Sequence, residues 1–141
     1  MRPGDLPAVQ QIELRSFPTP WSSRAFLAEL TENLYAHYIV AVSEERPVGY
    51  AGMWIVLDEA HITNIAVEPR LRGRRVGERL LRELILLAAE LGAQRMTLEV
   101  RRSNLVAQSL YRKLGFVKRG LRKGYYTDTH EDAIIMWLEE L

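Results

Sequence analysis

The chain has 141 residues, of which 48% are hydrophobic and 26% charged, with a formal net charge of +1. This size and composition predict one globular domain over residues 1–141, with a hydrophobic core of its own. The lack of cysteine excludes disulfides, thiolate metal sites and a cysteine nucleophile. The three histidines are too far apart for a short metal-binding motif, so no metal is expected.

The near-neutral charge argues against direct nucleic-acid binding. No apolar run has the length of a membrane span, and the first residues lack a signal-peptide pattern. We therefore expect a cytoplasmic protein with no membrane partner.

The first half of the chain predicts two helices followed by three strands. Apolar residues at helical spacing indicate a helix over residues 5–15, and Pro18 and Pro20 separate it from a second helix capped by Ser22 or Ser23. The strands are predicted at residues 35–42, 48–57 and 61–67, with a turn at 44–47 joining the first two.

The second half predicts two more helices and three more strands. In chain order these are a basic loop at 69–74, a helix at 75–91 ended by Gly92, a strand at 94–100, a helix at 104–114 ended by Gly115, and strands at 116–119 and 133–138 joined by a loop that contains residues 124–128. The fold class is therefore α/β (mixed α+β), with helices on both faces of a mixed sheet.

A glycine- and arginine-rich turn precedes the long helix at 75–91. A strand that leads through such a turn into a helix directs free backbone N–H groups and the positive end of the helix dipole to one point. This pattern favours binding of a phosphate or pyrophosphate. The alternative is a solvent-exposed basic helix start in which Gly73 serves only the turn.

Three polar residues of the second half are candidates for chemistry. Glu99 lies on the face of its strand opposite Met96, Leu98 and Val100, and is either an exposed glutamate, paired to Arg101, or a general base whose pKa is raised by partial burial. Asn104 is a helix N-cap, which is compatible with a binding role. Tyr111, seven residues on, is either a core aromatic or a proton donor to a leaving group.

Four aromatic residues, Phe17, Trp21, Tyr125 and Tyr126, are placed on two predicted loops far apart in sequence. Loops beside a sheet often line substrate grooves, although aromatic residues can equally pack to fix the loops.

Together these segments resemble the GNAT superfamily of acyl-CoA-dependent N-acetyltransferases over nearly the whole chain. Residues 72–77 (Arg-Gly-Arg-Arg-Val-Gly) resemble its pyrophosphate loop, Q/R-x-x-G-x-G/A, and residues 104–116 resemble its motif N-x-x-A-x-x-L-Y-x-x-L-G-F. Within the superfamily, residues 16–22, 64–67, 98–101, 103–104, 122–126 and 131–136 are most similar to the bacterial ribosomal-protein-alanine N-acetyltransferases of the RimI type.

The resemblance implies a GNAT-like sheet of about six to seven strands flanked by four helices, in the order (β)ααβββαβαββ. It also implies that acetyl-CoA is the co-substrate and that the amine attacks the thioester directly. In these roles Glu99 would act as the base and Tyr111 as the acid. The residues implied in cofactor binding are Ile65, Ala66, Val67, Arg72, Gly73, Arg74, Arg75, Val76, Gly77, Glu78, Asn104 and Tyr111. Phe17, Trp21, Tyr125 and Tyr126 are implied in substrate binding.

The sequence departs from the family pattern at two places. Arg75 stands where the loop usually has its first glycine, so the backbone there is expected to avoid a positive φ or else to alter the phosphate cradle. The first five residues leave little room for the usual first strand, which is expected to be missing or very short.

The implied acceptor is the N-terminal peptide of a small-subunit ribosomal protein that begins with alanine, and the enzyme is expected to be a monomer or weak dimer. Alternatives are acetylation of a lysine or a small amine, a non-catalytic acyl-CoA-binding or partner-binding module, and an RNA-binding module that uses the arginines.

Overall fold

The computed structural model describes residues 1–73 and 75–141. It contains six strands and four α-helices in the predicted order. The helices are α1 (Leu6–Ser16), α2 (Ser23–Thr31), α3 (Val76–Glu90) and α4 (Leu105–Lys113). The strands are β1 (Ala36–Ser43), β2 (Arg46–Val56), β3 (Glu59–Val67), β4 (Arg95–Arg101), β5 (Val117–Tyr126) and β6 (Glu131–Leu138). Short 3-10 helices lie at Pro3–Asp5 and Pro69–Leu71.

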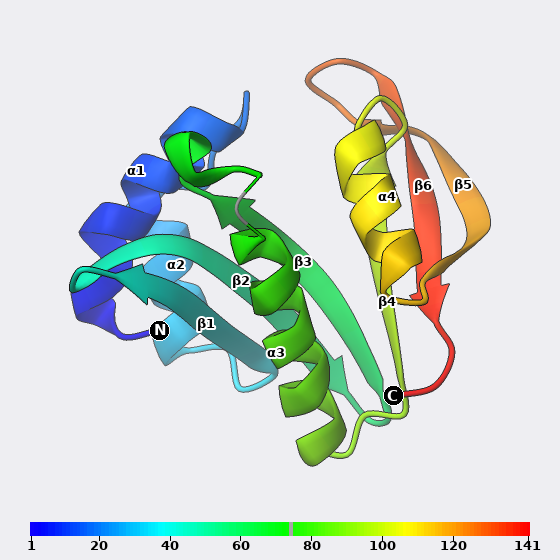
Figure 1. Ribbon diagram of the computed structural model, residues 1–141, viewed down its shortest axis with the longest axis horizontal. Coiled ribbons are helices and arrows are strands. Elements are labelled where there is room, and N and C mark those ends of the chain that lie inside the picture. Colours follow the sequence, from blue (N-terminus) through cyan, green and yellow to red (C-terminus); the bar gives the residue numbers. More distant parts are fainter. Residues whose placement is uncertain (74) are drawn as a thin grey trace.

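The six strands form one mixed sheet in the order β1-β2-β3-β4-β6-β5. Only β3 and β4 pair in parallel, and they do so over three residue pairs that end at His61 and Thr97. Beyond that point the two strands separate, as Figure 1 shows, so that β1–β3 and β4–β6 form two halves joined at one end. The separation leaves one edge of β3 and one edge of β4 without a strand partner.

A bulge in β3 lies where the strands separate. Gly52 of β2 pairs with Asn64 while Met53 pairs with Ile62, so that Thr63 is the extra residue. A bulge bends its strand and redirects its side chains. Here it turns residues 63–65 toward the opening between the halves, where they line a pocket described below.

Each face of the sheet carries its own apolar cluster. On one face, α1 and α2 contribute Val9, Ile12 and Phe26, which pack against Tyr50 of β2. On the other face, α3 packs its leucines on the sheet in a cluster that also includes Tyr111 of α4. The prediction of helices on both faces is thus confirmed.

The predicted helix ends are confirmed at several residues. The Ser22 side chain accepts a hydrogen bond from the Ala25 N–H at 3.1 Å and so caps α2. Gly92 and Gly115 have φ of 94° and 103°, a left-handed conformation that glycine adopts without strain and that ends α3 and α4. The first element is the 3-10 helix Pro3–Asp5, and no strand precedes α1 among the described residues.

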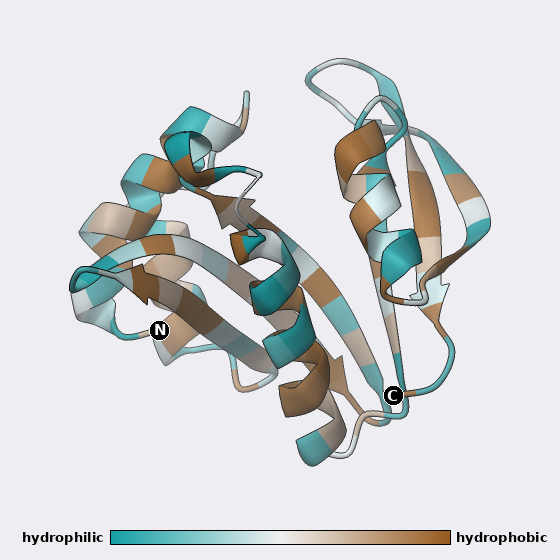
Figure 2. Cartoon of the chain, in the orientation of Figure 1, coloured by the Kyte–Doolittle hydropathy of each residue, from teal (hydrophilic) through white to brown (hydrophobic). Residues whose placement is uncertain are grey.

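The prediction for the C-terminal hairpin is wrong in one respect. β5 does not stop at Arg119 but continues to Tyr126, so Tyr125 and Tyr126 lie at the end of a strand and not in a loop. As the outermost strand, β5 is mostly exposed and lacks apolar alternation, and Figure 2 shows fewer hydrophobic residues on it than on its neighbour β6. Its extended form comes from pairing with β6, interrupted by two irregularities in register.

No helix in the described part of the chain combines the length and apolarity needed to cross a membrane.

Candidate active site

A pocket of about 440 Å³ lies where β3 and β4 separate. Both halves of the molecule line it, β3 with residues 62–65 and β4 with residues 98–101. Among the predicted site residues, Phe17, Trp21, Ile65, Glu99, Asn104, Tyr111, Tyr125 and Tyr126 all line this pocket. Residues that are up to 109 positions apart in sequence therefore meet in one cavity because the sheet opens at a single place.

Glu99 projects from β4 into this pocket with a side chain that is only 8% exposed. Its Oε2 lies 2.6 Å from Nε2 of His61 on β3, and its Oε1 lies 3.7 Å from a guanidinium nitrogen of Arg122 on β5. The carboxylate is thus held between the two halves of the sheet. Neither alternative from the sequence is fully correct, because Glu99 is buried and its partners are His61 and Arg122.

The predicted rise in the pKa of Glu99 is wrong. Burial does raise it, but the hydrogen bond and charge of His61 and the charge of Arg122 together bring the pKa below the usual 4.5. The carboxylate is therefore ionised and able to accept a proton at neutral pH.

Tyr111 faces the same pocket from α4 and is 6% exposed. Its ring packs against Phe116 at 5.9 Å between centroids, and burial raises the pKa of its hydroxyl to about 12. The two alternatives from the sequence are compatible, since Tyr111 belongs to the core and also lines the pocket. Its phenol remains protonated at neutral pH.

The predicted phosphate loop leads into α3. Whereas α2 and α4 are capped by Ser22 and Asn104, α3 has no side-chain cap within the described residues. The N–H groups of its first turn, from Val76 to Glu78, are consequently available to an anion. Arg74 was also assigned to this loop and lies outside the described residues.

Arg75 departs from expectation in its backbone. It does not avoid a positive φ, because its φ is 63° and its ψ 17°, which is the left-handed conformation. Gly73 is also left-handed, with φ of 85°. Arg75 therefore adopts a conformation that glycine reaches without strain, at a cost of about 1–2 kcal/mol for a residue with a side chain.

Three other predicted cofactor residues already use their side chains in contacts within the protein. Arg72 donates to the Ser16 hydroxyl at 3.1 Å, and Glu78 is paired with Lys113 at 2.5 Å and with Arg82 at 3.5 Å. Lys113 accordingly lowers the pKa of Glu78. The negatively charged side chain of Glu78 would repel an anion, so only its backbone N–H is suited to bind one. Asn104 caps α4 through Oδ1, which accepts from the Ala107 N–H at 3.1 Å, and Asn104 also lines the pocket.

Four aromatic side chains line the outer part of the pocket, two from each half. Tyr125 and Tyr126 meet edge to face at 5.1 Å, and the Arg101 guanidinium lies 4.0 Å from the centre of the Tyr126 ring. Arg101 also pairs with Asp128 at 2.9 Å, while Asp128 accepts from the Thr19 hydroxyl at 3.2 Å. The loop that holds Phe17 and Trp21 is thereby linked to the β5–β6 turn.

Comparison with known proteins agrees with this geometry. The family model of the acetyltransferase (GNAT) family matches residues 6–116. The chain belongs to the GNAT acetyltransferase family. A GNAT relative from Bacillus subtilis is 50% identical over 138 residues, which cover 98% of this chain and 91% of the relative. Ribosomal protein bS18-alanine N-acetyltransferase of Salmonella typhimurium is 41% identical over 136 residues, which cover 95% of this chain and 90% of the relative.

The fold is that of a GNAT enzyme. The crystal structure of ribosomal-protein-S18-alanine N-acetyltransferase from Escherichia coli superposes with a TM-score of 0.90 at 36% identity, covering 100% of this chain and 92% of that one. The protein is therefore an acyltransferase, and the co-substrate of its GNAT chemistry is acetyl-CoA.

The residues around the opening are suited to such a co-substrate. The uncapped first turn of α3 offers N–H groups to a pyrophosphate, and the edge of β3 beyond His61 offers backbone groups without a strand partner to an extended amide-containing arm. Ala66 and Val67 contribute only backbone there, because their side chains pack in the two apolar clusters. Among residues 1–73 and 75–141, no three His, Asp or Glu side chains are grouped to hold a metal ion.

Two residues that belong to the site were not identified from the sequence, His61 beside the pocket and Glu13 in its lining. His61 pairs with Thr97 across the β3–β4 junction, so it shares a face with Glu99 two residues further along β4. Only the pairing of these two strands shows this. Glu13 lines the pocket from α1. It shares the buried face of this helix with Leu6, Val9 and Ile12, and this spacing in the sequence could have indicated a buried glutamate.

Proposed function

We propose that this GNAT enzyme transfers the acetyl group of acetyl-CoA to the N-terminal alanine of a ribosomal protein of the small subunit. The main supporting observation is the single pocket that combines Glu99, Tyr111 and an aromatic wall at the opening of the sheet. The activity named for the Salmonella and Escherichia coli proteins supports the choice of acceptor.

In this proposal, the α3 turn and β3 bind acetyl-CoA. The N–H groups of Val76, Gly77 and Glu78 hold the pyrophosphate, the loop residues Arg72 and Arg75 add positive charge, and the NH₂ group of Asn104 donates a further hydrogen bond. Backbone groups of residues 65–67 hold the pantetheine arm and polarise the thioester carbonyl. Loss of one hydrogen-bond donor to a developing oxyanion costs roughly 3–4 kcal/mol in enzymes where it has been removed.

Glu99 receives the proton that the attacking amine must lose. An α-amino group has a pKa of about 8 and a lysine about 10.4, and the difference of about 2.4 units corresponds to about 3.3 kcal/mol. A carboxylate with a lowered pKa is a weak base, so the less basic N-terminal amine is the better acceptor. His61 at 2.6 Å fixes the orientation of the carboxylate.

Tyr111 protonates the thiolate of the departing CoA. Its hydroxyl has a pKa of about 12, above that of a thiol in water. The burial that raises the pKa of the phenol also raises that of a thiolate formed beside it, which brings the two groups closer in acidity. Phe17, Trp21, Tyr125 and Tyr126 form the wall against which the first residues of the acceptor lie.

The test is mass spectrometry of peptides after incubation with acetyl-CoA. One peptide begins with a free alanine and contains no lysine, and a second has a blocked N-terminus and one internal lysine. We expect acetylation of the first peptide only, and a loss of about 10²–10⁴-fold in kcat/KM for Glu99→Gln and for Tyr111→Phe. Acetylation of the lysine peptide alone would favour a lysine acetyltransferase, and full activity in both variants would refute the assigned roles.

A further inference from the structure

The segment between α1 and α2 forms one wall of the pocket but has no regular structure of its own. Residues 17–21 include two prolines, and Phe17, Thr19 and Trp21 from this segment line the pocket. A segment without a backbone hydrogen-bond ladder keeps its position only if other groups hold its polar atoms. The position of this wall therefore depends on contacts from the neighbouring elements.

Two side chains of α1 hold the backbone of Trp21 from both sides. Glu13 Oε2 accepts a hydrogen bond from the Trp21 N–H at 2.8 Å, and Gln10 Nε2 donates one to the Trp21 carbonyl at 2.7 Å. Gln10 and Glu13 are three residues apart and thus lie on one face of the helix. Both main-chain polar groups of Trp21 are bound by this pair.

Glu13 is itself held from the sheet. Its other carboxylate oxygen accepts a hydrogen bond from the Tyr50 hydroxyl on β2, and Glu13 and Tyr50 are 2% and 0% exposed. Burial raises the pKa of Glu13, and the hydrogen bonds from Tyr50 and Trp21 lower it. The Trp21 indole packs on Phe26 of α2 at 5.3 Å between centroids, so the residue is fixed by both its backbone and its ring.

We propose that Gln10 and Glu13 are positioning residues that hold the α1–α2 segment in place to bind the acceptor peptide. This inference rests on the proposed function, because it assigns the same pocket to the acceptor. The two positions have opposite requirements. Position 10 needs a donor for a carbonyl, whereas position 13 needs an acceptor for an N–H.

These requirements predict an asymmetry between two nearly isosteric exchanges. In Glu13→Gln, the new amide oxygen can still accept from Trp21 while its NH₂ donates to the Tyr50 hydroxyl oxygen, so the contact survives without the charge. In Gln10→Glu, the carboxylate has no hydrogen to donate and faces the Trp21 carbonyl. Glu13→Ala removes the contact altogether.

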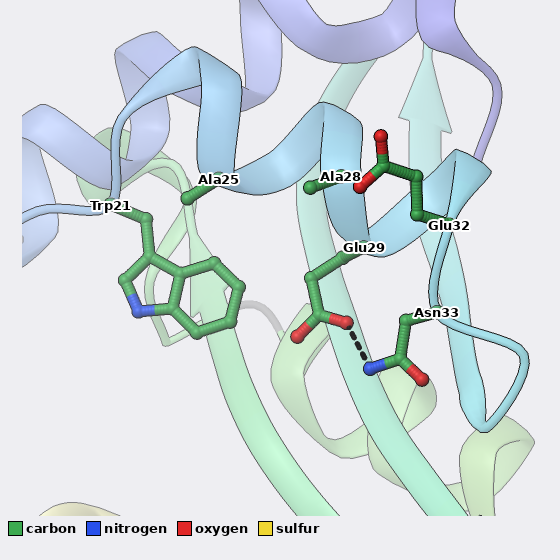
Figure 3. A pocket seen from close by; sticks show the side chains of 6 residues that line it. All are labelled: Trp21, Ala25, Ala28, Glu29, Glu32 and Asn33. Atoms are coloured by element: carbon green, nitrogen blue, oxygen red, sulfur yellow. Dashed lines mark hydrogen bonds between the residues drawn. The ribbon is translucent and has the colours of Figure 1, made fainter.

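Glu29 of α2 provides a matched control. It is also a nearly buried glutamate, 9% exposed, and it accepts hydrogen bonds from the Trp54 indole at 3.1 Å and from Asn33 at 2.7 Å. Glu29 lines a second hollow of about 450 Å³ together with Trp21 and Asn33, as Figure 3 shows, and it is not among the residues that line the acceptor pocket. Glu29→Ala therefore removes a similar carboxylate without touching the backbone of Trp21.

The experiment measures KM for the alanine peptide, KM for acetyl-CoA, and exchange of the Trp21 amide hydrogen by NMR. In Glu13→Ala and Gln10→Glu we expect KM for the peptide to rise about tenfold or more, with KM for acetyl-CoA unchanged. In Glu13→Gln and Glu29→Ala we expect both KM values to stay within about twofold of those of the parent enzyme. The Trp21 amide should exchange faster in Glu13→Ala alone, since its N–H partner is retained in the other variants.

Two outcomes would overturn the inference. If KM for the peptide rises as much in Glu13→Gln as in Glu13→Ala, peptide binding depends on the charge of Glu13 and not on its hydrogen bond to Trp21. If Gln10→Glu leaves KM for the peptide unchanged, the hold on Trp21 does not matter for binding, and this variant decides the question even where Glu13→Ala fails to fold. Should the parent enzyme acetylate no alanine peptide, the proposed function fails, while the exchange data still report whether Glu13 holds the segment.

Discussion

At the scale of single residues, the state of Glu99 is set by its neighbours. Burial alone would raise its pKa, and a general base with a raised pKa was one of the two predictions from the sequence. His61 and Arg122 reverse it, because a hydrogen bond and two nearby positive groups favour the carboxylate. The ionisation of Glu99, which we propose as the proton acceptor, is therefore set by side chains on three strands, β3, β4 and β5, and not by its own position alone.

Removing His61 should restore the effect of burial. In His61→Ala we expect the pKa of Glu99 to rise, measured by the ¹³C chemical shift of its carboxyl carbon against pH. Because the pKa is lowered in the parent, the stability that this carboxylate contributes is present above about pH 4.5 and is lost as the pH falls through the lowered value. In the variant, burial places the pKa of Glu99 above 4.5 and the sign reverses, so the contribution of Glu99 to stability is present below about pH 4.5 and is lost as the pH rises through the raised value. His37→Ala, on a strand separated from β4 by two others, should leave the titration unchanged.

The left-handed backbone of Arg75 is a second feature of single residues. An arginine at φ of 63° is strained by contact between its Cβ and the backbone, and glycine at the same place is not. The strain lies in the loop proposed to bind phosphate, where the guanidinium can contribute positive charge in return.

Replacing Arg75 should separate these two effects. We expect Arg75→Gly to raise the free energy of unfolding by about 0.5–1 kcal/mol, since relief of strain exceeds the greater entropy of glycine in the unfolded chain. The same variant should have a higher KM for acetyl-CoA through loss of charge. Arg75→Asn, which tolerates the left-handed region and is neutral, should show the same change in KM. Thermal unfolding measures the change in stability, and steady-state kinetics measure KM for acetyl-CoA. A lower Tm in Arg75→Gly would contradict the assignment of strain.

At the scale of elements, the helices differ in how their N-termini are completed. α2 and α4 carry side-chain caps, and α3, which follows the predicted phosphate loop, carries none among the described residues. An uncapped helix start leaves N–H groups that an anion can satisfy. α1 also lacks a side-chain cap, but it follows directly on the 3-10 helix Pro3–Asp5, whereas α3 starts beside the glycine- and arginine-rich turn. The uncapped start together with this turn supports the proposal that α3 holds the pyrophosphate.

Asn104→Asp should distinguish the cap from the contact with acetyl-CoA. Aspartate retains the oxygen that accepts from Ala107 but loses the NH₂ donor, so stability should change by less than about 0.5 kcal/mol. KM for acetyl-CoA should rise about tenfold, the worth of about one hydrogen bond. Ser22→Ala removes the corresponding cap of α2 and should show the opposite result, a loss of about 1 kcal/mol in stability with KM unchanged. An unchanged KM in Asn104→Asp would limit Asn104 to capping.

At the scale of the whole molecule, two half-sheets meet over three residue pairs and then diverge. The described pocket takes its walls from both halves, so a ligand at the opening contacts residues from each. Such a ligand adds contacts between the halves where backbone pairing is absent.

Acetyl-CoA should therefore protect both halves together. We expect slower hydrogen exchange, followed by mass spectrometry, at residues 65–67 of β3, at residues 98–101 of β4 and in the first turn of α3. A ligand concentration of about 100 times Kd should also stabilise the fold by about 2.7 kcal/mol. Protection confined to one half would contradict binding at the opening.

Sequence patterns predicted most elements because their signals are local. Helical spacing of apolar residues, a capping serine and two terminating glycines specify α2, α3 and α4 within a few residues. The long β5 was missed because an exposed edge strand has no apolar alternation, and its extended form depends on β6. The buried pair of Glu13 and Tyr50 was missed for a related reason, since they are 37 residues apart and lie on different elements.

The sequence by itself determined the order of elements, the family and the candidate residues Glu99, Asn104 and Tyr111, since each rests on spacing along the chain. Only the tertiary structure decided that Glu99 is ionised between His61 and Arg122, that Arg75 is left-handed and that α1 holds Trp21. The physical reason is that pKa values, backbone strain and hydrogen bonds between distant residues depend on distances through space, which exist only once the two halves of the sheet have packed.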